Sequence, residues 1–310
     1  MTTGANDRFA GIATGRKSRA RQRRGESLDG KTDLVVQGPH VLREDLEILQ
    51  LMTGAIGIEP LTRARCDAYR LHEPTSVAGI HEACGAAGYD FALVPHDEPW
   101  SRVRLVALDM DSTLITIECI DEIAALRGIG EDVARITAAA MRGEIDFRAS
   151  LERRVALLAG MPEADLVRVY DERLQISPGA VELLDECRRT GAKTLLVSGG
   201  FTFFTERLEA RLPLDFTLAN VLEIVDGRLT GRITGNIVDA DGKSACFREL
   251  AQRLCGDDGL AVAIGDGAND IPMLAAADVS IAWRAKPRVR ANAMHAIDHC
   301  DLDAVRNLFA

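Results

Sequence analysis

From residue 102 onward, short apolar runs alternate with longer amphipathic segments. The apolar runs have the length of strands and read RLVALD, AKTLLVSG, AVAIGD and DVSIAW. The segments between them repeat apolar residues every three or four positions, as helices do, and include AVELLDECRRTG, FTFFTERLEARL and KSACFRELAQRL. Because strands and helices alternate, the pattern predicts an α/β fold: a Rossmann-like parallel sheet with helices on both faces.

Two segments break this alternation. Residues 117–177 are helical in pattern throughout and contain no strand. An insertion directly after the first strand is expected to lie over the strand ends as a helical cap. Between Asn220 and Asp239, β-forming residues alternate around Asp226-Gly227, and this pattern predicts a hairpin.

Ahead of the core, residues 33–96 have the pattern of a small α/β unit, called here the amino-terminal unit. DLVVQG, FALVP and RARCDAYRLH are candidate strands, and VLREDLEILQLMTG and TSVAGIHEACGAAGYD are candidate helices. The polar segment HDEPWS, residues 96–101, indicates a linker, so we expect domains at 33–97 and 98–310. His72, His81 and His96 are far apart in the sequence, so we expect surface histidines and not metal ligands.

Charge is distributed unevenly along the 310 residues. The formal net charge is −10, which argues against a general nucleic-acid-binding protein. The first 32 residues instead carry eight Lys or Arg side chains and only three Asp or Glu, a net +5. This segment lacks the apolar core of a secretory signal. We expect residues 1–32 to be a disordered basic extension, with an organelle transit peptide or a nucleic-acid-binding tail as alternatives.

The cysteine pattern and the hydropathy bound the cellular context. The seven cysteines are an odd number, lie far apart and form no C-x-x-C motif, so neither a disulfide framework nor a cysteine zinc site is expected. No apolar run is long enough to span a membrane. We therefore expect a cytoplasmic protein with reduced thiols.

Candidate catalytic side chains follow several of the predicted strands. Asp109 and Asp111 follow the first strand, Ser198-Gly199-Gly200 the second, and Asp266 to Asp270 a later one, while Lys243 stands at a predicted helix start. In parallel sheets ligands bind beyond the carboxyl ends of the strands, so these groups are expected to meet there. Each motif alone is ambiguous, since D-x-D is often a turn or a calcium ligand pair and GDGAND could be a calcium loop.

Four carboxylates around one lysine require a cation in a desolvated cleft. Ligands that are all oxygen favour Mg²⁺ before Ca²⁺, and Mg²⁺ with a lysine and a serine suits a phosphate group. One aspartate can then attack phosphorus, and the other can donate a proton to the leaving oxygen if burial raises its pKa.

DMDST, VSGG, Lys243 and GDGAND, in this order, resemble the four motifs of the haloacid dehalogenase-like phosphatase superfamily over about residues 102–300. Within it, DMDSTLITIECIDEIA, ITAAAMRGEIDFRASLERRVALL and LLVSGGFTFF are most similar to the members that hydrolyse phosphoserine. The resemblance implies Asp109 as nucleophile and Asp111 as general acid and base. It implies Mg²⁺ held by Asp109, the Asp111 carbonyl and Asp266, with Asp270 in support.

The same resemblance implies a set of substrate-binding residues. The phosphoryl oxygens would be bound by Ser198, Gly199, Lys243 and Asn269. In the cap, Glu118 would bind the substrate ammonium and Arg154 its carboxylate, with Met141 and Phe147 closing over the substrate. An acid, a forked base and a phosphate cradle match the three charged groups of phosphoserine.

The expected activity is therefore Mg²⁺-dependent hydrolysis of O-phospho-L-serine through an aspartyl-phosphate, the last step of serine synthesis. The alternatives are a phosphatase for another small phosphorylated metabolite and a catalytically silent amino-acid sensor. The amino-terminal unit resembles ACT-like domains, which bind amino acids, and this implies either serine feedback or a structural, homodimer-forming role.

Overall fold

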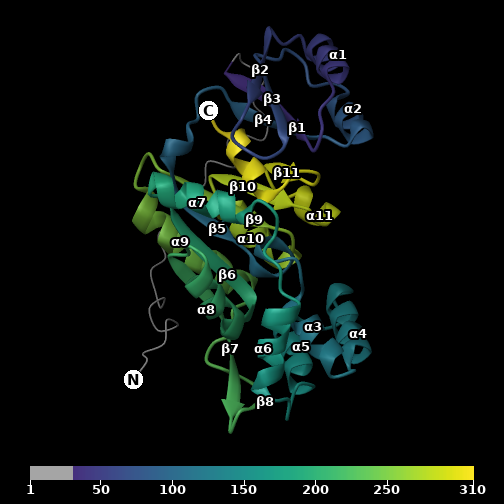
Figure 1. The fold of residues 1–310 in the computed structure, drawn as a ribbon, viewed down its shortest axis with the longest axis vertical. Helices are drawn as coiled ribbons and strands as arrows, with labels where there is room; N and C mark the ends of the chain where they lie inside the picture. Colours follow the sequence, from purple (N-terminus) through teal and green to yellow (C-terminus); the bar gives the residue numbers. More distant parts are fainter. Residues whose placement is uncertain (1–30) are drawn as a thin grey trace.

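The computed structural model describes residues 31–310 and contains two β-sheets (Figure 1). The basic extension expected at residues 1–32 lies outside the described residues, apart from its last two positions. Figure 1 places the amino-terminal unit at one end of the molecule, the cap helices at the other end, and the large sheet between them. The predicted α/β class is confirmed.

The core sheet has seven strands in the order β11-β10-β9-β5-β6-β7-β8. All neighbouring strands run parallel except the hairpin of β7 and β8 at one edge, where Asp226 and Gly227 form the turn with positive φ, as predicted. The strands are β5 (Val103–Leu108), β6 (Lys193–Phe201), β7 (Phe216–Val225), β8 (Arg228–Thr234), β9 (Leu260–Gly265), β10 (Val279–Trp283) and β11 (His295–Ile297). The sequence pattern missed the three-residue β11.

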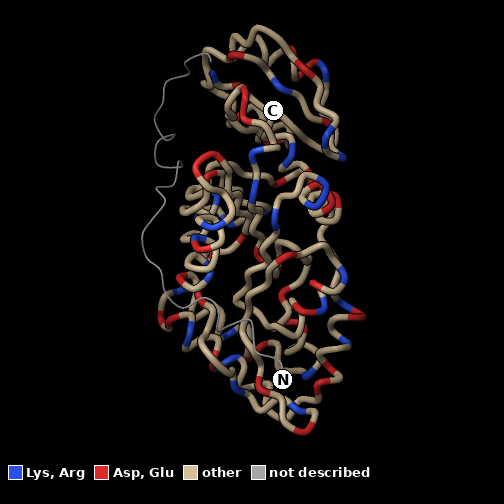
Figure 2. Tube along the Cα trace, turned by 90° about the vertical axis from the view of Figure 1, so that its left-hand side faces the viewer, with Lys and Arg blue, Asp and Glu red and all other residues tan. Residues whose placement is uncertain are grey.

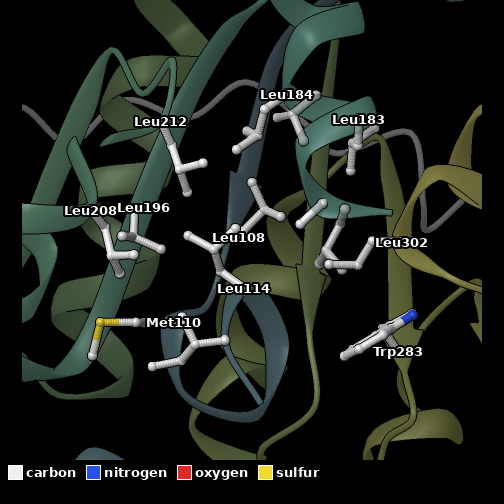
Figure 3. Close-up of a cluster of buried hydrophobic side chains, with 14 of the residues drawn as sticks. Leu108, Met110, Leu114, Leu183, Leu184, Leu196, Leu208, Leu212, Trp283 and Leu302 are labelled. Carbon is white, nitrogen blue, oxygen red and sulfur yellow. The ribbon is translucent and has the colours of Figure 1, made fainter. Parts of the chain in front are cut away.

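Helices cover both faces of this sheet because the strands alternate their side chains between two apolar layers. In β5, Val106 and Leu108 join the layer under α7 (Ala180–Thr190) and α8 (Thr202–Arg211), where Figure 3 shows leucines of helix and sheet in contact range. Leu105 and Ala107 join the layer under α9 (Ala240–Cys255) and α10 (Ile271–Ala276). The short α11 (Pro287–Arg290) was not predicted.

The helical insertion after β5 is present as predicted. It consists of α3 (Cys119–Leu126), α4 (Gly130–Met141), α5 (Phe147–Ala156) and α6 (Glu163–Glu172), which we call the cap. The β7–β8 hairpin supports it, because the Gly160 N–H donates to the Leu229 carbonyl at 2.8 Å. A Cβ at Gly231 would come within 2.9 Å of Ala159, so glycine permits this close approach.

The amino-terminal unit folds as a β-α-β-β-α-β antiparallel sheet in the order β2-β3-β1-β4. Its elements are β1 (Thr32–Gly38), α1 (Arg43–Thr53), β2 (Gly57–Leu61), β3 (Asp67–His72), α2 (Ile80–Ala87) and β4 (Asp90–Pro95). The sequence pattern missed β2, which contains Gly57 and Pro60. Both residues disfavour strands, but β2 lies at the sheet edge, where Pro60 needs no N–H partner on its outer side.

The amino-terminal unit packs against the carboxyl-terminal end of the core. The buried Asp90 carboxylate accepts the N–H groups of Asp298, His299 and Cys300 at 2.7–3.2 Å. The segment predicted as a linker is also packed and not free, since Trp100 is buried edge-to-face on Phe309 with ring centroids 5.0 Å apart. The two units therefore share one buried junction.

Acidic and basic residues are interspersed along the described chain (Figure 2). The seven cysteines are free thiols, and six of them are buried. Among residues 31–310, none of the helices is long and apolar enough to cross a membrane.

Candidate active site

Asp109 and Asp111 occupy a tight turn at the carboxyl end of β5. The Asp109 N–H donates to the Ile264 carbonyl of β9 at 3.0 Å, and its Oδ1 accepts the Met110 N–H at 2.7 Å. The chain then reverses at Ser112, which adopts a left-handed φ of 56°. Anchoring on both sides fixes the Asp109 carboxylate at the strand end, where a substrate can approach it.

Lys243 is the buried partner of Asp109. Its Nζ lies 2.6 Å from Asp109 Oδ1 and 2.8 Å from Asp270 Oδ1, and its side chain is fully buried. Lys243 stands in the first turn of α9, where the Asp239 side chain caps the helix by accepting the Gly242 N–H. Burial lowers the pKa of Lys243, but Asp109 and Asp270 outweigh this effect and raise it, so the side chain stays charged.

Three carboxylates converge here as a candidate metal site. Asp109, Asp266 and Asp270 each offer an oxygen, and these atoms lie within 4.8 Å of one another. Burial, followed by repulsion from Asp270, raises the pKa of Asp266 to about 6 and that of Asp109 well above its usual range. One lysine does not balance three acids, so a hard divalent cation fits this oxygen-only cluster.

Asp111 is set up differently from Asp109. Its Oδ1 accepts the Cys119 N–H at the start of the cap at 3.0 Å. Burial, assisted by the neighbouring Glu118 carboxylate, raises the pKa of Asp111 to about 7. Near neutral pH this carboxyl group can therefore hold a proton and release it, as a general acid and base must.

The loop after β6 is shaped by its glycines. The buried Ser198 accepts the Gly200 N–H at 2.8 Å through its Oγ. A Cβ at Gly200 would lie 2.8 Å from Asp111 Oδ2, and one at Gly199 would lie 3.0 Å from Phe147 of the cap. Only glycine lets this loop approach both the turn that carries Asp111 and the cap so closely.

The cap residues reach the site to different extents. Phe147 packs on the glycine loop, and Glu118 accepts a 2.7 Å hydrogen bond from Ser112. Burial lowers the pKa of Arg154, whereas the charges of Asp121, Glu118 and Asp111 raise it. Arg154 therefore faces acidic groups that include Asp111 of the turn after β5. Met141 is 68% exposed at the end of α4, so the described conformation leaves it uncovered. Asn269 lies in the turn with Asp266 and Asp270.

Two further buried residues, Thr113 and Asn220, belong to the site although no sequence motif pointed to a role for them. Thr113 donates to Asp266 Oδ1 at 3.2 Å and orients that carboxylate. Asn220 donates to the Gly199 carbonyl at 2.8 Å and accepts the Val238 N–H at 2.7 Å, so it joins the glycine loop to the segment before α9. The signal available for Asn220 was a polar residue inside the apolar pattern of β7.

A family comparison identifies the core. The model of the haloacid dehalogenase-like hydrolases matches residues 106–275, which run from β5 to α10 and include the carboxylate cluster and Lys243. The chain is a haloacid dehalogenase-like hydrolase. The family expected from the four sequence motifs is therefore confirmed.

Individual relatives of this hydrolase bear related names. A curated phosphoserine phosphatase of Polaromonas sp. is 50% identical over 217 residues, which are 67% of this chain and 90% of the relative. The crystal structure of a probable phosphoserine phosphatase from Vibrio cholerae superposes with a TM-score of 0.76 at 36% identity, covering 92% of this chain and 88% of that one. A phospho-aspartyl intermediate analogue of phosphoserine phosphatase covers 67% of this chain and 100% of its own, with a TM-score of 0.62 at 35% identity.

Proposed function

We propose that this hydrolase is a phosphoserine phosphatase, which converts O-phospho-L-serine to L-serine and phosphate. The observation that carries the proposal is the meeting of Asp109, Lys243 and Asp111 beneath a cap that presents Glu118 and Arg154. The names of the relatives support the same substrate.

In the first step, Asp109 attacks phosphorus and forms an aspartyl-phosphate, while the bond to the serine oxygen breaks. Asp111 gives its proton to that departing oxygen, as its pKa of about 7 permits. Lys243 neutralises charge on the phosphoryl oxygens, and Ser198 and the N–H groups of the glycine loop bind them.

In the second step, water attacks the phosphorus of the aspartyl-phosphate. Asp111, now ionised, takes a proton from that water, and Asp109 is released as a carboxylate. Mg²⁺ at Asp109, Asp266 and the Asp111 carbonyl would neutralise charge developing on the transferred group, and Asp270 would support Asp109 through Lys243.

Substrate selection falls to the cap. Glu118 would bind the serine ammonium and Arg154 its carboxylate, and Phe147 would cover the apolar part from its position on Gly199. Met141 is proposed to close over the substrate from the end of α4. Asn269, beside Asp266, is proposed to contact the phosphoryl group.

The decisive experiment is phosphate release from phosphoserine and from three comparison substrates, with Mg²⁺ or with a chelator. Phosphoethanolamine lacks the carboxylate, glycerol phosphate lacks both amino-acid charges, and p-nitrophenyl phosphate reports the bare phosphatase activity. We expect phosphoserine to have the highest kcat/KM by at least tenfold and chelation to abolish turnover. Asp109→Asn serves as the blank for contaminating phosphatases.

Equal kcat/KM values for phosphoserine and phosphoethanolamine would instead favour a phosphatase for another small phosphorylated metabolite. No release from any of the four substrates with Mg²⁺ would favour a non-catalytic protein. Cytoplasmic location, a role in serine synthesis and a homodimer remain predictions.

A ligand-binding role of the amino-terminal unit has a candidate location at its junction with the core. A cavity of about 1010 Å³ lies between β4 and residues 287–299, with Leu93, Arg290 and Met294 in its lining. Its lining shares no residue with the catalytic cluster. Serine binding that persists in Arg154→Ala, which keeps this cavity but removes the proposed carboxylate contact in the cap, tests the sensor role apart from the catalytic site.

A further inference from the structure

Three polar side chains of the amino-terminal unit meet where β1, β3 and the end of β4 lie side by side. Asp33 on β1 is buried, and its Oδ2 lies 3.0 Å from Nδ1 of His96 and 3.4 Å from Nδ1 of His72. The antiparallel registers that pair Leu34 with Leu71, and Thr32 with Pro95, bring these residues together. The expectation that these histidines lie apart is therefore wrong for His72 and His96, although His96 is exposed at the surface as predicted.

The spacing of these atoms fits a small tetrahedral metal ion. Zn²⁺ binds histidine nitrogen and carboxylate oxygen at about 2.0–2.2 Å, which separates neighbouring ligand atoms by about 3.3 Å. The two distances from Asp33 Oδ2, 3.0 and 3.4 Å, bracket this value, and all three ligand atoms lie within 4.8 Å of one another. One ion could contact all three with little movement.

The surroundings of His72 point to a cation in the same place. Its Nε2 lies 3.2 Å from Glu59 Oε2, whereas its buried Nδ1 has no hydrogen-bond partner. When Nε2–H donates to Glu59, the Nδ1 lone pair faces the lone pairs of the Asp33 carboxylate, and a cation between them removes the repulsion. A carboxylate on one histidine nitrogen and a metal on the other is a recurrent arrangement in metalloproteins.

We infer that Asp33, His72 and His96 form a second metal site, for a borderline divalent ion of the zinc type. The two nitrogen ligands distinguish it from the oxygen-only catalytic cluster, because imidazole suits Zn²⁺ while Mg²⁺ prefers oxygen. His96 is 52% exposed, so the site is open to ions from solvent. Three protein ligands leave a fourth coordination position for water.

Arg70 competes with a metal ion for the Asp33 carboxylate, and it also links this site to the core. Its Nη1 lies 3.4 Å from Asp33 Oδ2, but it keeps other acceptors, the carbonyl of His96 at 3.4 Å and that of Phe309 at 2.6 Å. Its positive charge weakens metal binding. Because Arg70 reaches Phe309 at the end of the core, a metal here would stiffen the junction between the two units and take no part in phosphoryl transfer.

The test is a Zn²⁺ titration of the full chain in excess Mg²⁺, which fills the oxygen-only cluster. We expect one equivalent of Zn²⁺ to bind, and at least tenfold weaker binding to His72→Gln and to His96→Gln. His81→Gln is the matched control, because this exposed histidine of the same unit lies on Phe91 outside the cluster. Circular dichroism and phosphate release should be the same in all variants and show that they fold.

Co²⁺ absorption of the unaltered chain gives a second readout that needs no variant. Intense visible bands of a four-coordinate Co²⁺ site, displaced by one equivalent of Zn²⁺, would support the site. Absence of these bands, or equal Zn²⁺ affinity in His72→Gln and the unaltered chain, would overturn it. The cluster would then be held together by the contacts of Asp33 with Arg70 and the two histidines alone.

Discussion

Two polar clusters, one in each sheet, place one Lys or Arg side chain against a buried carboxylate. In the core, the hydrogen bonds of Lys243 Nζ within residues 31–310 go to two carboxylates, Asp109 and Asp270, and the cluster keeps an excess of negative charge. In the amino-terminal unit, Arg70 contacts Asp33 and also two backbone carbonyls from other segments. The first arrangement leaves negative charge that a cation can balance, and the second ties separate parts of the chain together.

The position of each cluster in its sheet explains this difference. Asp109 follows the last residue of a central parallel strand, where the loops open toward the cap. Asp33 lies inside β1, between two antiparallel neighbours, and its Oδ1 accepts the Glu73 N–H at 3.2 Å. Strand ends expose side chains to ligands, whereas positions within a paired strand are surrounded by protein.

The largest effect on turnover is expected from a substitution in the core cluster, which replaces the attacking carboxylate oxygen of Asp109. Asp109→Asn should lower phosphoserine turnover by roughly 10⁴-fold or more, because an amide cannot form the aspartyl-phosphate. The fold should persist, since the amide oxygen can still accept from Lys243 and Met110. Phosphate release and thermal unfolding measure the two effects, and turnover within tenfold of the unaltered chain would mean that the nucleophile is a different residue.

A smaller effect is expected in the cap. Arg154→Ala should raise KM for phosphoserine by roughly 10- to 100-fold, since a hydrogen bond to a charged group contributes about 1.5–3 kcal/mol. KM for p-nitrophenyl phosphate, which has no carboxylate, should change little. Arg153→Ala is the control, because that neighbouring arginine is exposed on the same helix. Equal losses on both substrates would contradict a carboxylate-binding role.

If Asp111 donates the proton to the leaving oxygen, the rate of the first step should fall about tenfold per pH unit above the pKa of Asp111. Below its pKa of about 7 the group is protonated and can donate, and above it the donor is lost. Single-turnover release of serine should therefore slow as the pH rises above 7. Release of p-nitrophenolate, which leaves without a proton, should stay nearly level, so parallel declines for both substrates would exclude Asp111 as the acid.

The smallest effect on turnover, and the largest on stability, is expected at the second cluster. Asp33→Asn should change kcat by less than twofold, because no element of the catalytic site contacts it. It should cost about 3 kcal/mol of unfolding free energy, because it leaves the buried Arg70 without its carboxylate. Denaturant unfolding measures this loss. A large drop in kcat with unchanged stability would show that the two clusters are coupled.

The amino-acid sequence by itself determined the α/β core, the cap and the carboxylates that converge on Lys243. The reason is that these features are local: a strand's apolar run ends directly before the carboxylate that joins the cluster, as at Asp109 and Asp266. A parallel sheet then brings the strand ends to one edge whatever the lengths of the intervening segments. The hairpin at Asp226-Gly227 is equally local, because its tight turn requires positive φ at both positions and Asp and Gly can adopt it.

Only the tertiary structure decided which distant residues meet. Asp33, His72 and His96 belong to three segments, and their contact depends on strand order and register, which periodicity does not encode. The edge strand β2 escaped notice because its pairing comes from a neighbour and not from its own propensity. Asn220 likewise gains its role from two loops that packing delivers to it, since a buried amide must find its partners wherever the fold provides them.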